Sequence, residues 1–189
     1  MKDEVRSVNR ACLQAAMKLC DCEDKWQKCM LREFGMVEKD KALIQGLDRE
    51  TVRRKSENPT VLFKVRQDRM RNAVQGLARG ADYYNARHMV SKESSMAVSV
   101  YAGALLKCLQ DNVNECCMRF GISPEMGDEL LNHDTDEVID AMLANHVTFE
   151  PSRSFKAMFS ANNNLERTRF MLQDMTNFLS SNKVLVSTF

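Results

Sequence analysis

Apolar residues recur at three- and four-residue intervals along most of the chain, which is the spacing of one face of an α-helix. The longest weakly charged stretch is residues 97–120, where charge is confined to Lys107, Asp111, Glu115 and Arg119, four positions apart. A helix with so narrow a polar strip is covered on most sides, so we expect residues 97–120 to form the central helix. Gly103, between two alanines, predicts a close crossing with another helix.

Shorter helices are predicted on both sides of this centre. They are expected in residues 3–34 (one or two helices), 36–47, 59–79, 124–131, 134–146, 152–160 and 165–179, with 48–58 as a short helix or an exposed connection. No segment alternates with period two over enough residues to predict a sheet. The predicted fold is therefore all-α, with two packed helical subdomains and a C-terminal helical segment.

The expected boundaries follow the distribution of charge. Residues 1–80 would form an N-terminal subdomain that is neutral and then basic, residues 81–150 an acidic middle subdomain around the 97–120 helix, and residues 151–189 the C-terminal helices and tail. Basic residues outnumber acidic ones by 12 to 5 in residues 41–92, whereas acidic residues outnumber basic ones by 11 to 2 in residues 93–150. The formal net charge of +1 thus conceals a strongly bipolar chain, which favours charged partners.

Several classes of protein are disfavoured by the composition. No apolar run approaches the roughly 18–20 residues of a membrane span, and the first residues lack a signal-peptide pattern. Seven cysteines without a regular framework favour a reducing compartment. Phosphate-binding loops and the common hydrolase motifs are absent, and Cys20, Cys22 and Cys29 lack a fourth local ligand for zinc. We therefore expect a non-enzymatic protein without catalytic residues, metal or cofactor.

Charged clusters are the strongest candidates for a functional role. The basic cluster, predicted to contact lipid or RNA, consists of Arg53, Arg54, Lys55, Lys64, Arg66, Arg69, Arg71 and Arg79. The acidic cluster, predicted to mediate self-association, consists of Glu125, Asp128, Glu129, Asp134, Asp136, Glu137 and Asp140. Phosphates of RNA and anionic lipid headgroups both attract basic surfaces in a salt-dependent manner. The alternative interpretation is that both clusters are solvated helix faces that bind no partner.

Three collinear segments resemble the matrix protein of orthomyxoviruses, the influenza-type layer beneath the envelope. They are residues 41–46 (KALIQG), 65–76 (VRQDRMRNAVQG) and 99–121, which begins SVYAGALLKC and ends MRFG. The resemblance implies an all-helical structural protein that polymerises head to tail under the envelope. It also implies contacts with anionic phospholipid, with the viral ribonucleoprotein or RNA, and with envelope glycoprotein tails. Arg66, Arg69 and Arg71 match the family's arginine-rich helix.

The expected location is then the virion beneath the envelope, the host cytoplasm and the inner face of the plasma membrane, with the nucleus left open. The chain departs from the family in lacking its basic nuclear-localisation cluster before the central helix and its zinc-like Cys-Cys-His-His pattern, so neither property is carried over. Two alternatives remain: a helical RNA-binding protein that does not polymerise, and an intracellular adaptor whose acidic middle docks a basic partner.

Overall fold

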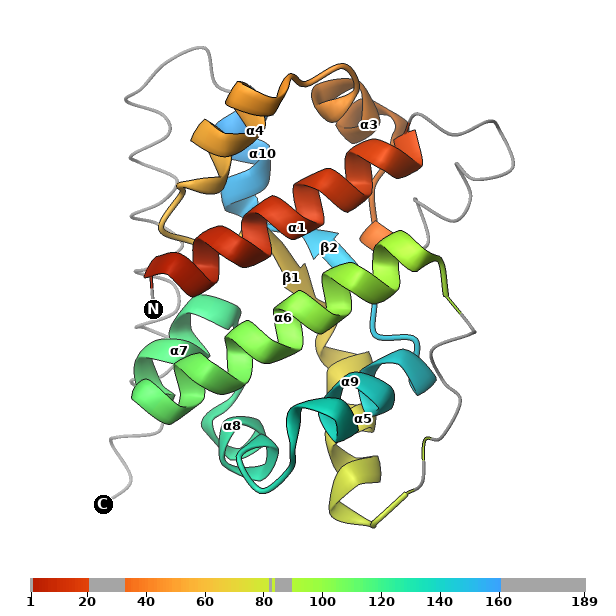
Figure 1. Cartoon of the computed structure of the whole chain (residues 1–189), viewed down its shortest axis with the longest axis vertical. Helices are drawn as coiled ribbons and strands as arrows, with labels where there is room; N and C mark the ends of the chain where they lie inside the picture. Colours follow the sequence, from red (N-terminus) through yellow and green to blue (C-terminus); the bar gives the residue numbers. More distant parts are fainter. Residues whose placement is uncertain (1, 21–32, 82, 84–89, 161–189) are drawn as a thin grey trace.

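The computed structural model describes residues 2–20, 33–81, 83 and 90–160 (Figure 1). In these residues nine helices surround one small antiparallel sheet, which confirms the predicted all-α class. The helices are α1 (Lys2–Cys20), α3 (Glu38–Ile44), α4 (Arg49–Ser56), α5 (Gln67–Ala78), α6 (Lys92–Asp111), α7 (Val113–Phe120), α8 (Pro124–Leu130), α9 (Thr135–Ala144) and α10 (Arg153–Ser160). The strands are β1 (Phe63–Val65) and β2 (Phe149–Pro151). The helix expected in residues 165–179 lies outside the described residues.

Helices α1 and α6 pack against each other across the middle of the molecule, and the two strands lie behind them (Figure 1). One end carries α3, α4 and α10, and the other carries α5, α8 and α9. One hydrophobic core joins all of these elements. Val8 of α1, Leu105 of α6 and Phe155 of α10 are all fully buried in it. Each of the three ranges predicted as separate units therefore contributes to the same core.

The central helix is shorter than predicted, because residues 97–120 do not form one continuous helix. Helix α6 ends at Asp111 and α7 begins at Val113. Between them Asn112 adopts an extended conformation (φ −163°, ψ 105°), and its side chain accepts a hydrogen bond at 3.0 Å from the backbone N–H of Glu115. Asparagine offers the backbone this local alternative to a continuous helix, which the apolar periodicity alone did not reveal.

The prediction of a helix from residue 59 to 79 is wrong in its first third, and so is the expected absence of a sheet. Val61, Leu62 and Phe63 are consecutive and all fully buried, whereas a helix covered on one face would bury only some of three consecutive residues. Strand β1 pairs with β2 in the register Phe63–Pro151, Lys64–Glu150 and Val65–Phe149. This partner lies more than eighty residues later in the sequence, so no local pattern marked the pair. Helix α5 begins only after Arg66.

Glycine supports a close helix crossing in this fold, but not at the predicted position. Among the described residues, and apart from the adjacent residues and nearby backbone of α6 itself, no atom lies within 4 Å of a Cβ built on Gly103, so no close neighbour requires glycine there. The close approach occurs instead at Gly127 of α8. A Cβ at Gly127 would lie 2.9 Å from Cδ2 of Leu109 and 3.1 Å from Sγ of Cys117. Gly127 therefore allows α8 to pack tightly on α6 and α7.

Candidate binding surfaces

The eight basic residues predicted to bind lipid or RNA lie in two separate groups. Arg53, Arg54 and Lys55 belong to α4, whereas Arg66, Arg69, Arg71 and Arg79 lie on or next to α5. Lys64 belongs to β1, and the stem of its side chain lies beside Gly121. Because α4 and α5 lie at opposite ends of the molecule (Figure 1), the structure distributes these residues over two surfaces.

The first group belongs to a surface that we name the basic end, formed by the exposed or half-exposed basic residues of α4 and α10. It comprises Arg49, Arg53, Arg54, Lys55, Arg153 and Lys156. Arg53 forms ion pairs with Glu50 at 2.6 Å and Glu57 at 3.2 Å. Within the described part of the chain, Arg54, Arg153 and Lys156 are exposed and form no ion pair. The charge of Arg54 contributes to lowering the pKa of the nearby Asp48 and Glu50, whereas no such effect of Arg153 or Lys156 is found in the described residues.

The contribution of α10 to this end was missed in the sequence analysis. Arg153 and Lys156 follow α4 by about one hundred residues, so no run of basic residues marked them. The available signal was the amphipathic spacing of α10, in which Phe155 is fully buried while Arg153 and Lys156 are exposed. Only the tertiary arrangement places these side chains at the same end as α4 (Figure 1).

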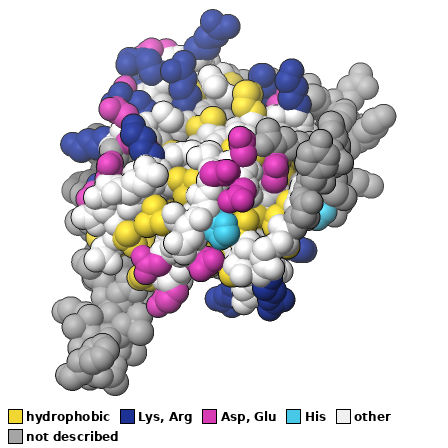
Figure 2. Space-filling model, turned by 60° about the horizontal axis from the view of Figure 1, so that its bottom comes forward, with side chains coloured by type: hydrophobic (Ala, Val, Ile, Leu, Met, Phe, Trp, Pro, Cys, Tyr) yellow, Lys and Arg dark blue, Asp and Glu magenta, His cyan; other side chains and the backbone are white. Residues whose placement is uncertain are grey.

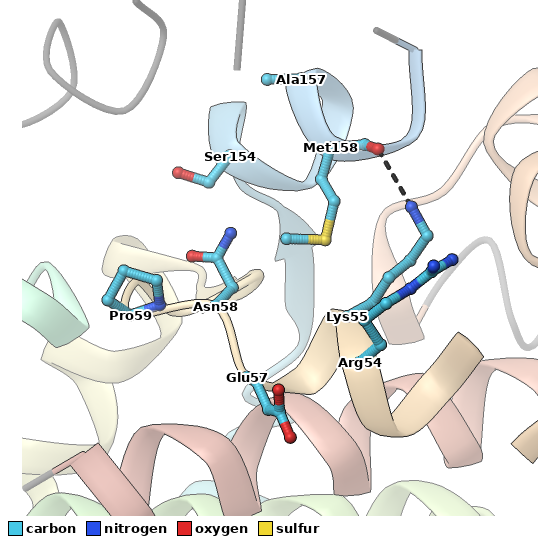
Figure 3. Close-up of a pocket in the computed structure, with 8 residues that line it drawn as sticks. All are labelled: Arg54, Lys55, Glu57, Asn58, Pro59, Ser154, Ala157 and Met158. Atoms are coloured by element: carbon cyan, nitrogen blue, oxygen red, sulfur yellow. Dashed lines mark hydrogen bonds between the residues drawn. The ribbon is translucent and has the colours of Figure 1, made fainter. Parts of the chain in front are cut away.

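A hollow of about 390 Å³ lies between α4 and α10; we call it the α4–α10 hollow (Figure 3). It is lined by Arg54, Lys55, Glu57, Asn58, Pro59, Ser154, Ala157 and Met158. Figure 3 shows the amide of Asn58 directed towards α10, whereas the carboxylate of Glu57 points away from it. The lining therefore combines two cationic residues, one acidic residue and an amide with the apolar surface of Met158 and Pro59.

Lys55 is held in place differently from its neighbour Arg54. Its Nζ donates a hydrogen bond to the backbone carbonyl of Met158 at 3.1 Å (Figure 3), in the last turn of α10. The same ammonium lies 4.1 Å from the centroid of the Phe159 ring, within the range of a cation–π interaction. A cation at a helix C-terminus also interacts favourably with the helix dipole. Lys55 thus joins α4 to the end of α10.

The second basic group lies on α5, close to acidic residues. Arg66 precedes α5 and donates to Asp68 through Nε at 3.3 Å and Nη2 at 3.1 Å. Arg69, Arg71 and Arg79 are exposed and, in the described residues, form no ion pair. Helix α5 packs directly on α9, which begins with the acidic residues of the predicted self-association face. The basic and acidic parts of the sequence are therefore neighbours within one molecule.

Four of the seven predicted acidic residues line a second hollow, of about 410 Å³, which we call the α5–α9 hollow. It is lined by Leu77, Gly80, Ala81, Tyr83, His133, Asp134, Asp136, Glu137 and Asp140. Figure 2 shows acidic side chains gathered around a histidine on this face, with basic side chains along other parts of its border. The remaining three predicted residues, Glu125, Asp128 and Glu129, belong to α8.

Asp134 and Glu137, which line the α5–α9 hollow, also stabilise the start of α9. Oδ1 of Asp134 accepts a hydrogen bond from the backbone N–H of Glu137 at 2.8 Å, and Oε2 of Glu137 accepts one from the N–H of Asp134 at 3.1 Å. This reciprocal pair is a capping box. The ring of His133 lies 3.4 Å from Glu129 and 3.3 Å from Glu137.

On α8, a hydrogen bond from Ser123 lowers the pKa of Glu125.

Within the described ranges, no group of three or more histidine, cysteine or carboxylate side chains is arranged to hold a metal ion. Cys22 and Cys29, two of the three cysteines considered for zinc, lie outside those ranges. None of the described helices combines the length and apolar character required to cross a bilayer.

The chain was compared with protein-family models, with curated proteins and with solved structures. No family model, no curated protein and no solved structure matches it.

Proposed function

We propose that this protein is a self-assembling structural protein of the viral matrix type, which binds an anionic membrane through its basic end. The observation that carries the proposal is the exposed charge of Arg54, Arg153 and Lys156 at the end formed by α4 and α10, none of which forms an ion pair in the described residues. The collinear resemblance to orthomyxovirus matrix proteins supports the same function. A non-enzymatic role in the virion, beneath the envelope, is part of this proposal.

The basic end suits a membrane better than α5 does, for an electrostatic reason. Charges separated by less than the Debye length of about 8–10 Å influence each other strongly at physiological salt. The arginines of α5 lie on a helix that packs against α9, so the carboxylates of α9 weaken their attraction to anionic lipid. At the basic end, the carboxylates of Glu50 and Glu57 are paired with Arg53. We therefore assign membrane contact to α4 and α10 rather than to Arg66, Arg69 and Arg71, which the resemblance had implicated.

The end that carries α5 and α9 is assigned to self-association. Its arginines and carboxylates allow the α5 surface of one copy to contact the α9 surface of the next. Such a contact joins two different surfaces, and it builds an open chain or layer when the rotation between copies does not close. The same arginines remain available to the ribonucleoprotein once the protein is attached to the membrane.

Vesicle flotation at low and high salt tests the membrane assignment. The basic-end variant carries Arg54→Glu, Arg153→Glu and Lys156→Glu. Its matched control carries Arg69→Glu, Arg71→Glu and Arg79→Glu, which changes the net charge equally. We expect the wild type and the control to float with phosphatidylserine-containing vesicles at low salt only, and not with phosphatidylcholine vesicles. The basic-end variant should remain unbound although its circular dichroism is unchanged.

Two results would count against the proposal. If the wild type does not float with anionic vesicles under any condition, membrane binding is excluded. RNA binding with a steep salt dependence would then favour the non-polymerising RNA-binding protein. If the control variant loses flotation and the basic-end variant keeps it, α5 is the membrane surface.

A further inference from the structure

Two cysteine thiols that the proposed function does not use meet where α6 ends and α7 begins. Cys108 lies in the last turn of α6 and Cys116 in α7, and both are fully buried. In one continuous helix, residues eight positions apart would be separated by about 12 Å along the axis. The extended conformation of Asn112 interrupts the helix between them, and this break allows the two side chains to approach each other.

The side chain of Cys116 reaches back to the turn of α6 that carries Cys108. Its Sγ lies 3.5 Å from the backbone carbonyl oxygen of Leu105. A short polar side chain on a helix can reach the carbonyl oxygen three residues before it, so the same oxygen is within range of Cys108. A hydrogen bond also joins the thiols of Cys108 and Cys116. A disulfide requires its two side chains to approach each other in this way.

This contact makes the two thiols unequal. The hydrogen bond from Cys116 lowers the pKa of Cys108, and the same hydrogen bond raises the pKa of Cys116. A thiol with a lowered pKa is ionised more often, and the thiolate is the form that attacks an oxidant. Cys108 is therefore the attacking sulfur, and Cys116 is the partner that completes a disulfide.

Cys117, although adjacent to Cys116 in the sequence, is directed towards a different helix. Its Sγ lies 3.1 Å from the position that a Cβ on Gly127 of α8 would take, and its thiol donates to the carbonyl of Ser123 at 3.6 Å. Burial raises the pKa of Cys117 to about 11, which keeps this thiol protonated and unreactive. Cys117 therefore provides a control for Cys116.

We propose that Cys108 and Cys116 are an oxidisable pair whose disulfide fastens α7 to α6, with hydrogen peroxide as the oxidant. The Cys108 thiolate attacks one peroxide oxygen, the O–O bond breaks, and the departing hydroxide takes up the proton that Cys108 released. The sulfur of Cys116 then attacks the sulfenic acid on Cys108. The S–S bond forms, the S–O bond breaks, and the hydroxyl leaves with the proton of Cys116. Two thiols are oxidised, and the peroxide is reduced to two molecules of water.

Helix α7 must open for this reaction, because both thiols are fully buried. It has eight residues, and it lies between the extended Asn112 and Gly121, whose φ is +71°. Short helices open locally at a lower cost in free energy than the core, and hydrogen peroxide is small enough to enter through such an opening. The disulfide then closes a loop of about nine residues across Asn112. The inference does not depend on the proposed membrane function.

Peptide mapping identifies the pair, because trypsin releases residues 108–119 as one peptide that contains Cys108, Cys116 and Cys117. The full chain is treated with stoichiometric hydrogen peroxide, alkylated in urea and digested without reduction. The wild-type peptide should lose two hydrogen atoms and carry one alkyl group. In Cys117→Ala it should lose two hydrogen atoms and carry none. In the matched variant Cys116→Ala, both remaining thiols should be alkylated.

Three alkylated thiols in the wild-type peptide would overturn the inference. Absence of the disulfide in folded Cys117→Ala would also overturn it, because Cys117 would then be one of the two partners. Circular dichroism shows whether each variant is folded.

Hydrogen exchange of the α7 amides, residues 113–120, tests the fastening in the wild type without any variant. Oxidation should slow their exchange by roughly tenfold or more, because the disulfide restricts the opening of α7. Dithiothreitol should restore the original rate, and the amides of α9 serve as the internal reference. Equal exchange of the oxidised and reduced protein would show that the disulfide does not fasten α7 to α6.

Discussion

The side-chain carbonyl of Asn9 on α1 accepts a hydrogen bond from the backbone N–H of Leu62 at 2.7 Å. Its amide nitrogen lies within 3.0–3.4 Å of the carbonyl oxygens of Thr60, Asn58 and Ser56. Asn9 is fully buried, and buried backbone groups require such partners. One side chain therefore fixes the turn between α4 and β1, and with it the position of the basic end relative to α1.

Replacing Asn9 with leucine should destabilise the protein by about 3 kcal/mol, because several buried backbone groups lose their partner at once. Urea unfolding followed by circular dichroism measures this change. The matched control is Asn72→Leu, at an exposed position on α5, where we expect a change within about 0.5 kcal/mol. Similar unfolding midpoints for the two variants would show that Asn9 does not hold the turn.

Gly103 of α6 and Gly127 of α8 should respond to alanine in opposite ways. Gly103→Ala is expected to stabilise the protein by up to about 1 kcal/mol, because alanine favours the helix and the described structure leaves room for its Cβ. Gly127→Ala should destabilise it by about 1–3 kcal/mol, because the Cβ would overlap Leu109 and Cys117. Thermal unfolding of both variants tests this pair. Destabilisation by Gly103→Ala would indicate that the predicted close crossing exists after all.

Acid should weaken the contact between α1 and α6 through Glu4. Its Oε1 lies 2.5 Å from Nζ of Lys107, and this hydrogen bond is the largest of several causes that lower the pKa of Glu4 from 4.5 to about 2. A lowered pKa in the folded state stabilises the protein fully above about pH 4.5, and this stabilisation is lost as the pH falls towards 2. Because Lys107 is 66 % exposed, we expect a contribution of only about 1–2 kcal/mol.

The check on Glu4 is urea unfolding of wild type, Glu4→Gln and Lys107→Gln at pH 6 and pH 2.5. Both variants should be less stable than the wild type at pH 6 and should approach it at pH 2.5. A gap between wild type and Glu4→Gln that is the same at both pH values would mean that ionisation of Glu4 does not contribute to stability.

The sequence predicted most of the helices because their signals are local. Ser91, Ser123 and Asp134 cap α6, α8 and α9 through their side chains, and Gly121 ends α7 with φ +71°. The errors have two causes, a strand partner that is distant in the sequence and a capping residue inside an apolar stripe. Residues 63–65 form a strand because β2 pairs with them, and α6 ends at Asp111 because Asn112 caps the next helix. Apolar periodicity carries neither kind of information.

The candidate surfaces were harder to predict than the helices, because they depend on how elements that are distant in the sequence pack together. Charge counts identified the basic and acidic segments, but they could not show that α5 packs on α9 or that α4 lies at the other end. Lys55 shows that a basic run in the sequence does not reveal which of its charges the fold engages. Its position in the run Arg53-Arg54-Lys55 suggested a free charge, whereas the fold engages it with Met158 and Phe159, about one hundred residues away.

Self-association should follow the charges of α5 and α9, and a charge swap can test this. Arg69→Glu with Arg71→Glu, and Asp136→Lys with Asp140→Lys, should each weaken self-association at least tenfold at low salt, because each creates like-charge contacts across the interface. Mixing the two variants should restore complexes, since the reversed surfaces complement each other. Analytical ultracentrifugation at low and high salt measures this. If the mixture stays monomeric while the wild type associates, the interface lies on another surface.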